Sequence, residues 1–161
     1  MYKMHGFTLG STSIVIQSHI IGMFLPSLIT GTLIKKYGHS KIIYSGALIY
    51  LICIFLSFYD QTFINYLIAL VLLGIGWNFL FIGGTSLLVL CYKESEKFKV
   101  QGFNDVLVFS IQSIASLTAG YSILKFSWNE INLACIPLVI LIILVSIRSD
   151  IYQKKLAVSK S

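Results

Sequence analysis

Residues 74–86 read GIGWNFLFIGGTS and lie inside a long apolar run. The stretch contains four glycines, one tryptophan and one asparagine. A helix that only anchors a protein in lipid needs none of these, because glycine contributes no apolar side chain and an unpaired amide is costly in hydrocarbon. Small residues do, however, let the backbones of two membrane helices approach closely. The stretch therefore predicts a membrane helix that packs against other helices.

The composition places the whole chain in the membrane. Of its 161 residues, 57% are apolar and 11% are charged, and the mean hydropathy is +0.86. Soluble domains have about one quarter of their residues charged. The net charge of +6 fits lysines in cytoplasmic loops better than a nucleic-acid surface, since the sequence shows no basic stripe with interleaved aromatic residues. We therefore predict an all-α, polytopic membrane protein that forms one transmembrane domain over residues 1–161.

Five segments are long and apolar enough to be membrane helices, which need about 20 mainly apolar residues to cross the hydrocarbon core. The expected spans are residues 11–34, 42–58, 63–92, 106–124 and 131–147. The second and fifth are near the short limit. The third is long, so it is expected to tilt, to project from the lipid or to contain a break near its glycines.

The positive residues predict an orientation. Ten Lys and Arg residues lie in loops 35–41 and 93–105 and in the tail 148–161, whereas the other side has Lys3 and Lys125. Positive loops stay in the cytoplasm. We therefore expect a cytoplasmic C-terminal tail, frayed in structure, and an N-terminus outside. An odd number of spans would follow if one helix were missing upstream.

Metal, disulfide and catalytic chemistry find little support in the sequence. The cysteines, Cys53, Cys91 and Cys135, are far apart and lie in or beside apolar runs. This pattern is typical of cysteine as a small apolar residue, so we expect no metal and no cofactor. No carboxylate pair, nucleophile triad or phosphate-binding loop is visible, and we expect no enzymatic activity.

Helical periodicity separates two faces of the third span. Ala69, Gly76 and Gly83 share one face, and Gly76 and Gly83 are expected to pack against a neighbouring helix. Asn78 and Thr85 lie on the nearly opposite face. The Asn78 amide needs a partner there, either a structural hydrogen bond to another helix or a substrate in a wet cavity. Trp77 lies near the middle of the span, as a packed or cavity-lining aromatic does.

Two further spans carry polar residues. In the first span, Pro26 is expected to kink the helix, and His19 is expected either to form a structural hydrogen bond or to serve coupling or substrate contact. Gln17 lies on another face. In the fourth span, Gln112 belongs to a stripe of polar and small residues that either packs or lines a translocation path. The candidate pathway residues are His19, Asn78 and Gln112, followed by Gln17, Trp77 and Thr85.

The loop GTLIKKYGHSK at residues 31–41 resembles the signature loop of the major facilitator superfamily. The signature-loop residues are Gly31, Lys35, Lys36 and Gly38, and the two glycines match the family's pattern. The family has an acidic residue where this chain has Lys35, and a basic pair where it has His39 and Ser40. The stretches VIQSHIIGMFLPSLITG, LLGIGWNFLFIGGTSLL and KVQGFNDVLVF are similar to the second half of bacterial facilitator-type transporters.

This resemblance implies the last five helices of a six-helix C-terminal half, with residues 1–7 as the stub of the first. It also implies transport of a small solute across the bacterial inner membrane, possible only with a separately encoded N-terminal half. The alternatives are an inactive truncated gene product and a non-transporting assembly or structural protein. A membrane-embedded enzyme is disfavoured, since His19 alone supplies no catalytic set.

Overall fold

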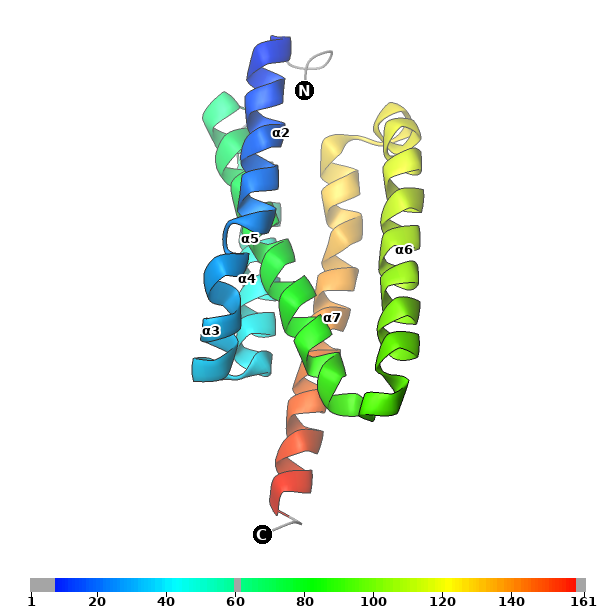
Figure 1. Cartoon of the computed structure of the whole chain (residues 1–161). Coiled ribbons are helices and arrows are strands. Elements are labelled where there is room, and N and C mark those ends of the chain that lie inside the picture. The colour runs from blue at the N-terminus through cyan, green and yellow to red at the C-terminus, as the bar shows by residue number, and fades with distance from the viewer. Residues whose placement is uncertain (1–7, 60–61, 159–161) are drawn as a thin grey trace.

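A computed structural model describes residues 8–59 and 62–158, and every element in these residues is a helix (Figure 1). The expected helix stub at residues 1–7 and the last three residues of the tail lie outside the described residues. The elements are α2 (Leu9–Phe24), α3 (Ser27–Tyr37), α4 (His39–Tyr59), α5 (Phe63–Leu88), η1 (Val89–Cys91), η2 (Glu94–Glu96), α6 (Lys97–Lys125) and α7 (Trp128–Val158).

Local chemistry explains several of these boundaries. The hydroxyl of Thr8 accepts a hydrogen bond from the Ser11 amide at 3.1 Å and caps α2. Thr62 caps α5 in the same way. Pro26 has no amide hydrogen, so the first expected span divides into α2 and α3 at this residue. Gly38, with φ of 88°, ends α3 and lets α4 begin at the next residue.

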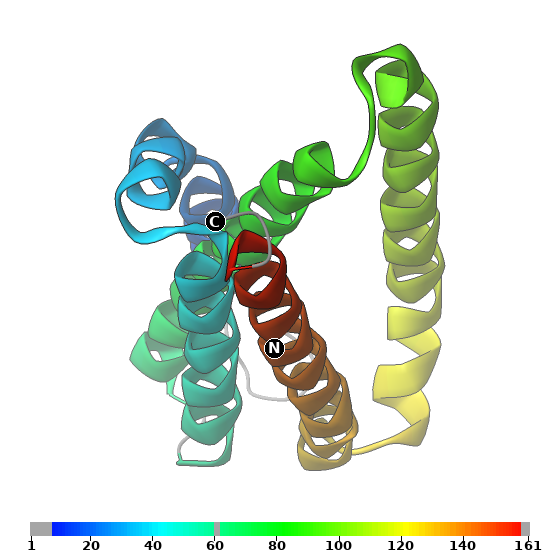
Figure 2. The same cartoon turned by 90° about the horizontal axis from the view of Figure 1, so that it is seen from below.

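Helix α5 occupies the centre of the packed part of the molecule. It packs along both α2 and α4, and α7 packs against α4 (Figures 1 and 2). Helix α6 touches the other helices at few positions, and all its residues from 111 to 120 are exposed. The view from below shows α6 standing apart from the remaining helices (Figure 2). One long surface of α6 is therefore left without a protein neighbour among the described residues.

The number of apolar helices differs from the expected five. Four stretches of the described residues are long and apolar enough to cross a membrane: Leu9–Tyr37, His39–Tyr59, Phe63–Cys91 and Asn129–Ile151. The fourth expected span, 106–124, lies within α6, whose 29 residues are sufficient in length.

Several expected boundaries also differ. Helix α6 begins at Lys97, nine residues before the expected start of the span, and α7 continues through Val158. The segment expected to be a frayed tail is therefore helical as far as that residue. Helix α5 runs without a break through its glycines, because a glycine in a packed helix gains contacts that offset its conformational freedom.

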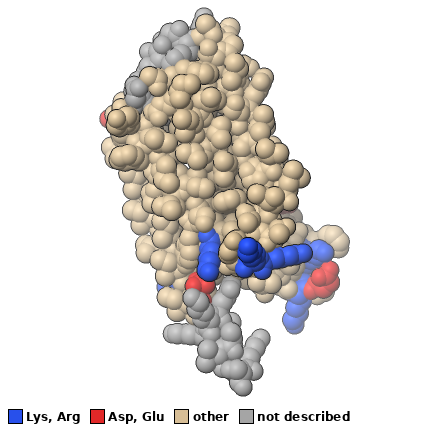
Figure 3. All heavy atoms as spheres, turned by 90° about the vertical axis from the view of Figure 1, so that its left-hand side faces the viewer, with Lys and Arg blue, Asp and Glu red and all other residues tan. Residues whose placement is uncertain are grey.

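The basic loops meet at one end of the bundle. Helix α3 ends, α6 begins and α7 finishes at the lower end of the molecule (Figure 1). Lys and Arg side chains gather at this end of the face shown in Figure 3. The bundle thus has one basic end, as the alternation of loops predicts.

Candidate functional site: the α2–α3 break, the α5 crossing and the α6 stripe

Asn78 on α5 joins three groups at the break between α2 and α3. Its Nδ2 donates to the Met23 carbonyl and to the Ser27 hydroxyl, both at 2.7 Å. The Thr30 hydroxyl donates to Asn78 Oδ1 at 2.7 Å. Asn78 is 1% exposed and Thr30 is 0% exposed. We call these four groups the Asn78 clasp; its two central side chains, Asn78 and Thr30, are buried, Met23 is half-buried and Ser27 lies at the exposed edge.

The clasp has a clear physical cause. A helix leaves its last carbonyl groups without partners inside the helix, and Pro26 cannot supply an amide hydrogen to the turn before it. Met23 lies in the last turn of α2, and its carbonyl accepts from Asn78 instead. A membrane helix can break only where other groups satisfy the backbone. The sequence left two alternatives for Asn78, a structural hydrogen bond to another helix or a substrate contact. The contacts with Met23, Ser27 and Thr30 correspond to the first alternative.

His19 lies where α2 crosses α5. Its Nδ1 is 2.8 Å from the Leu70 carbonyl oxygen, and because a carbonyl only accepts, Nδ1 carries the hydrogen. Gly22 and Gly74 make this close crossing possible. A Cβ atom at Gly74 would lie 2.5 Å from the His19 carbonyl oxygen, and one at Gly22 would lie 2.8 Å from that of Val71. His19 is half-buried, and its bond holds α2 against α5.

The opposite face of α5 contacts α4. A Cβ atom at Gly76 would lie 2.6 Å from the Tyr50 ring, and one at Gly83 would lie 2.8 Å from the Ile43 side chain. Cys53 donates to the Ala69 carbonyl at 3.1 Å. Small residues therefore lie on two faces of α5, each against a different helix.

A third side of α5 carries an aromatic cluster. The rings of Trp77 and Phe81 are stacked, with centroids 4.7 Å apart and planes 10° apart. Phe109 on α6 lies 6.5 Å from Phe81 and is tilted by 53°. Such geometries are favourable for aromatic pairs. This cluster joins α5 to α6, whose contacts with the other helices are few.

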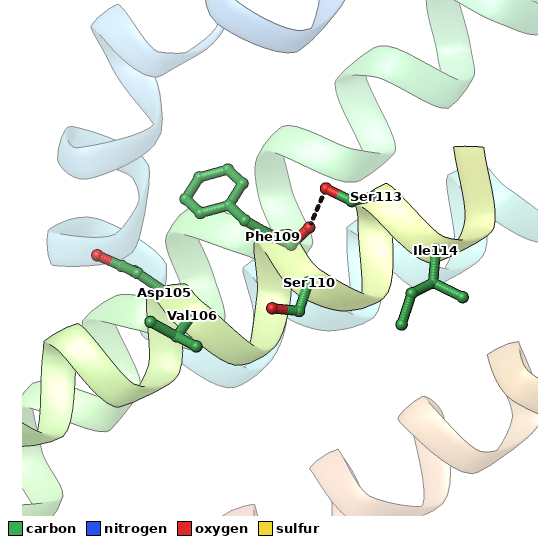
Figure 4. Close-up of a pocket in the computed structure, with 6 residues that line it drawn as sticks. All are labelled: Asp105, Val106, Phe109, Ser110, Ser113 and Ile114. Atoms are coloured by element: carbon green, nitrogen blue, oxygen red, sulfur yellow. Dashed lines mark hydrogen bonds between the residues drawn. The ribbon is translucent and has the colours of Figure 1, made fainter. Parts of the chain in front are cut away.

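Helix α6 presents its polar stripe next to this cluster. At 100° per residue, Gln112, Ser113 and Ser116 fall on one side together with Phe109. Two shallow hollows follow this side, one around Phe109 and Ser113 and the next around Gln112 and Ser116. In Figure 4 the residues that line the first hollow all come from α6, and the Ser113 hydroxyl donates to the Phe109 carbonyl at 2.7 Å. The stripe is open rather than packed.

The remaining predicted residues do not join these groups. Gln17 is exposed on α2 and donates to Ser13 at 3.3 Å within the same helix. Thr85 is half-buried on α5, two turns beyond Trp77. A partly enclosed cavity of about 330 Å³ between α4, α5 and α7 is lined by none of the predicted pathway residues and is mostly apolar. Within the described residues, no group of three metal-ligating side chains occurs.

Sequence reasoning did not select Ser27, Phe81 or Phe109. Phe81 follows Trp77 by four residues, which is the spacing of neighbours on one helix face, so that pair had a signal in the sequence. Ser27 and Phe109 reach their partners across helices. Periodicity within one helix does not identify such pairs.

The family assignment rests on a match along almost the whole chain. The model of the Major Facilitator Superfamily matches residues 1–159. The chain belongs to this superfamily. The expected family is therefore confirmed, and with it an all-helical, multi-pass membrane protein that forms a partial facilitator bundle.

Curated relatives are transporters of greater length. The riboflavin transporter RfnT of Brucella anthropi is 34% identical over 139 residues, which cover 86% of this chain and 35% of the relative. The uncharacterized MFS-type transporter YdeG of Bacillus subtilis is 35% identical, with 81% and 31% covered. A second such transporter of this bacterium, YddS, is 35% identical, with 84% and 33% covered. The chain thus spans about a third of each. No solved structure gives a significant match.

Proposed function

We propose that this chain forms part of the wall of a translocation path in a facilitator-type transporter for a small solute. The observation that carries this proposal is the polar stripe of α6. Residues 111–120 are exposed, and Gln112, Ser113 and Ser116 lie along one side of them. Polar side chains are unfavourable against lipid tails and are found beside water or other protein groups. A translocation path that contains water and solute is such a polar environment.

The wall in this proposal consists of Gln112 on α6 and of Trp77 and Thr85 on α5. Gln17 remains a second-line candidate on the exposed side of α2. His19 and Asn78 have supporting roles, because their hydrogen bonds join α2 and α3 to α5. A complete path between two bundles requires more helices than this chain contributes, from the same polypeptide or from a second one.

The aromatic cluster points to the class of solute. Trp77 and Phe81 offer a flat stacked surface, and Gln112 lies one turn from Phe109 with an amide that can both donate and accept. A planar heteroaromatic molecule with polar edges fits this combination. The relative RfnT is by name a riboflavin transporter, and riboflavin is such a molecule. We take riboflavin as the first solute to test, with the basic end of the bundle in the cytoplasm of a bacterium.

Uptake of labelled riboflavin by the cells of origin tests this proposal, with variants introduced into the chromosome so that every natural partner is present. Trp77→Leu and Phe81→Leu are each expected to lower uptake about three- to tenfold, because an aromatic pair contributes about 0.5–1.5 kcal/mol. Phe55→Leu is the matched control. Phe55 is exposed on α4 away from the cluster, and its replacement is expected to leave uptake unchanged.

The outcomes separate the parts of the proposal. If the wild-type chain takes up another solute of a metabolite panel but not riboflavin, the solute class is wrong and transport stands. If deletion of the gene changes uptake of no solute, a non-transporting structural role is the better account. An equal loss in all three variants would indicate general destabilisation.

A further inference from the structure

Two loops at the basic end of the bundle have the same number of lysines but different net charge. Loop 35–41 contains Lys35, Lys36 and Lys41 and has no Asp or Glu. Loop 93–105 contains three lysines and three carboxylates. These are Lys93, Lys97, Lys99, Glu94, Glu96 and Asp105. The first loop therefore has an uncompensated positive charge, whereas the second is neutral.

The structure concentrates the charge of the first loop. Lys35 and Lys36 lie in the last turn of α3, Lys41 lies in the first turn of α4, and Gly38 alone separates the two helices. All three lysines are exposed. Among the described side chains, a salt bridge joins Lys97 to Glu94 at 3.4 Å, in the other loop.

One carboxylate does reach the first loop. Asp150 on α7 accepts a hydrogen bond from the Ser40 hydroxyl at 3.0 Å. It forms no salt bridge with the three lysines, and the exposed Arg148 on the same helix opposes its charge. The net charge of loop 35–41 together with Arg148 and Asp150 therefore remains positive.

The apolar pattern on either side of the loop is that of a loop at the depth of lipid headgroups. The first apolar stretch ends at Tyr37, and the second begins at His39. Tyr37 is partly exposed, and the Lys36 ammonium lies 5.1 Å from the centre of its ring. Tyrosine and lysine at the ends of membrane helices occupy the headgroup region, where the aromatic ring stays at the interface and the amine extends into water.

We propose that the lysines of loop 35–41 form a selective binding surface for anionic phospholipid headgroups, and that loop 93–105 does not. The headgroup phosphate supplies the charge that no carboxylate of the described residues supplies to these lysines. Each basic residue at a membrane surface increases the preference for anionic lipid by about fivefold. In loop 93–105 the neighbouring carboxylates cancel this attraction.

Native mass spectrometry of the chain of residues 1–161 in neutral detergent tests this surface. The measured quantity is the ratio of apparent affinities for phosphatidylglycerol and phosphatidylcholine. The triple substitution Lys35→Gln, Lys36→Gln and Lys41→Gln is expected to lower this ratio at least about tenfold. The matched control is Lys93→Gln, Lys97→Gln and Lys99→Gln, which changes the total charge equally and is expected to lower the ratio less than about twofold.

Two further measurements show whether a lower ratio is caused by misfolding of the variant and whether the preference is electrostatic. A triple Lys→Arg variant of loop 35–41 is expected to keep the wild-type ratio. For the wild-type chain, about 1 M salt is expected to abolish the preference, since the Debye length is then about 3 Å. The proposal is overturned if both Gln triples lower the ratio equally, if neither does, or if salt leaves the wild-type ratio unchanged.

Discussion

At the scale of single residues, Asn78 has the most demanding position in the chain. It makes hydrogen bonds to groups of α2 and α3 from a site that is almost fully buried on α5. A buried polar group without its partner is costly, and this applies to the Met23 carbonyl as much as to the amide itself. The structure thus gives Asn78 a supporting role at the break made by Pro26.

Replacement of Asn78 by Leu is expected to destabilise the chain by about 1–3 kcal/mol, because buried donors and acceptors lose their partners. Thermal unfolding in detergent, followed by the loss of helical circular dichroism, measures this effect. Gln17→Leu is the control. Gln17 is exposed and bonds only within its own helix, so its replacement is expected to change stability by less than about 0.5 kcal/mol. Equal stability of the two variants would argue against the clasp.

The sequence alone gave a partial view of this residue. A period of 3.6 residues places Asn78 opposite Gly76 and Gly83 and shows that its amide needs a partner. It does not show that the partners are Met23 and Ser27, about 50 positions away along the chain. That information depends on which helix covers which face, and the pattern within one span does not contain it.

At the scale of elements, α5 is a central helix with closely packed neighbours on two sides. Gly74 faces α2, and Gly76 and Gly83 face α4. Gly84 lies on the same helix with no atom within 4 Å of a Cβ built upon it. Replacing Gly74 and Gly84 by alanine, one at a time, therefore distinguishes the effect of close packing on stability from the effect of helix propensity.

Gly74→Ala is expected to destabilise the chain by about 1–3 kcal/mol, because the new methyl group would meet backbone atoms that cannot rotate away. Gly84→Ala is expected to be neutral or to stabilise it by up to about 1 kcal/mol, since alanine loses less conformational entropy in a helix. The temperature of unfolding of the two variants in the same detergent measures the difference. A Gly74→Ala variant as stable as Gly84→Ala would contradict the crossing of α2 and α5.

Helix α6 extends beyond the span that its composition predicts. Its apolar segment suggested a span of residues 106–124, whereas the helix covers Lys97–Lys125 and is the least apolar of the long helices. A span whose neighbours are polar or aqueous needs fewer apolar residues than one in lipid. Helix α6 as a whole is less apolar than the expected span because its first nine residues, before the span begins, include two lysines and three other polar side chains.

At the scale of the whole molecule, the sequence predicted the helical class, the family and one basic end, and these agree with the structure and with the family match. The sequence did not predict which helices pack against each other. Helices α2, α3 and α4 pack around α5 and α7 packs against α4, whereas α6 is joined to α5 by the aromatic cluster, touches α7 at few positions and is otherwise open. The central claim is that the polar side of this open helix faces water in a translocation path.

Thiol labelling along α6 in native membranes tests this claim most directly. Single cysteines are placed at Gln112, Ser113 and Ser116 on the stripe and at Leu107, Ile111 and Thr118 on the opposite side, in a chain without its own cysteines. A charged, membrane-impermeant maleimide needs water to react with a thiol. The account predicts rapid labelling of the three stripe positions and little labelling of the other three. Equal labelling of both sides, or none at the stripe, would contradict it.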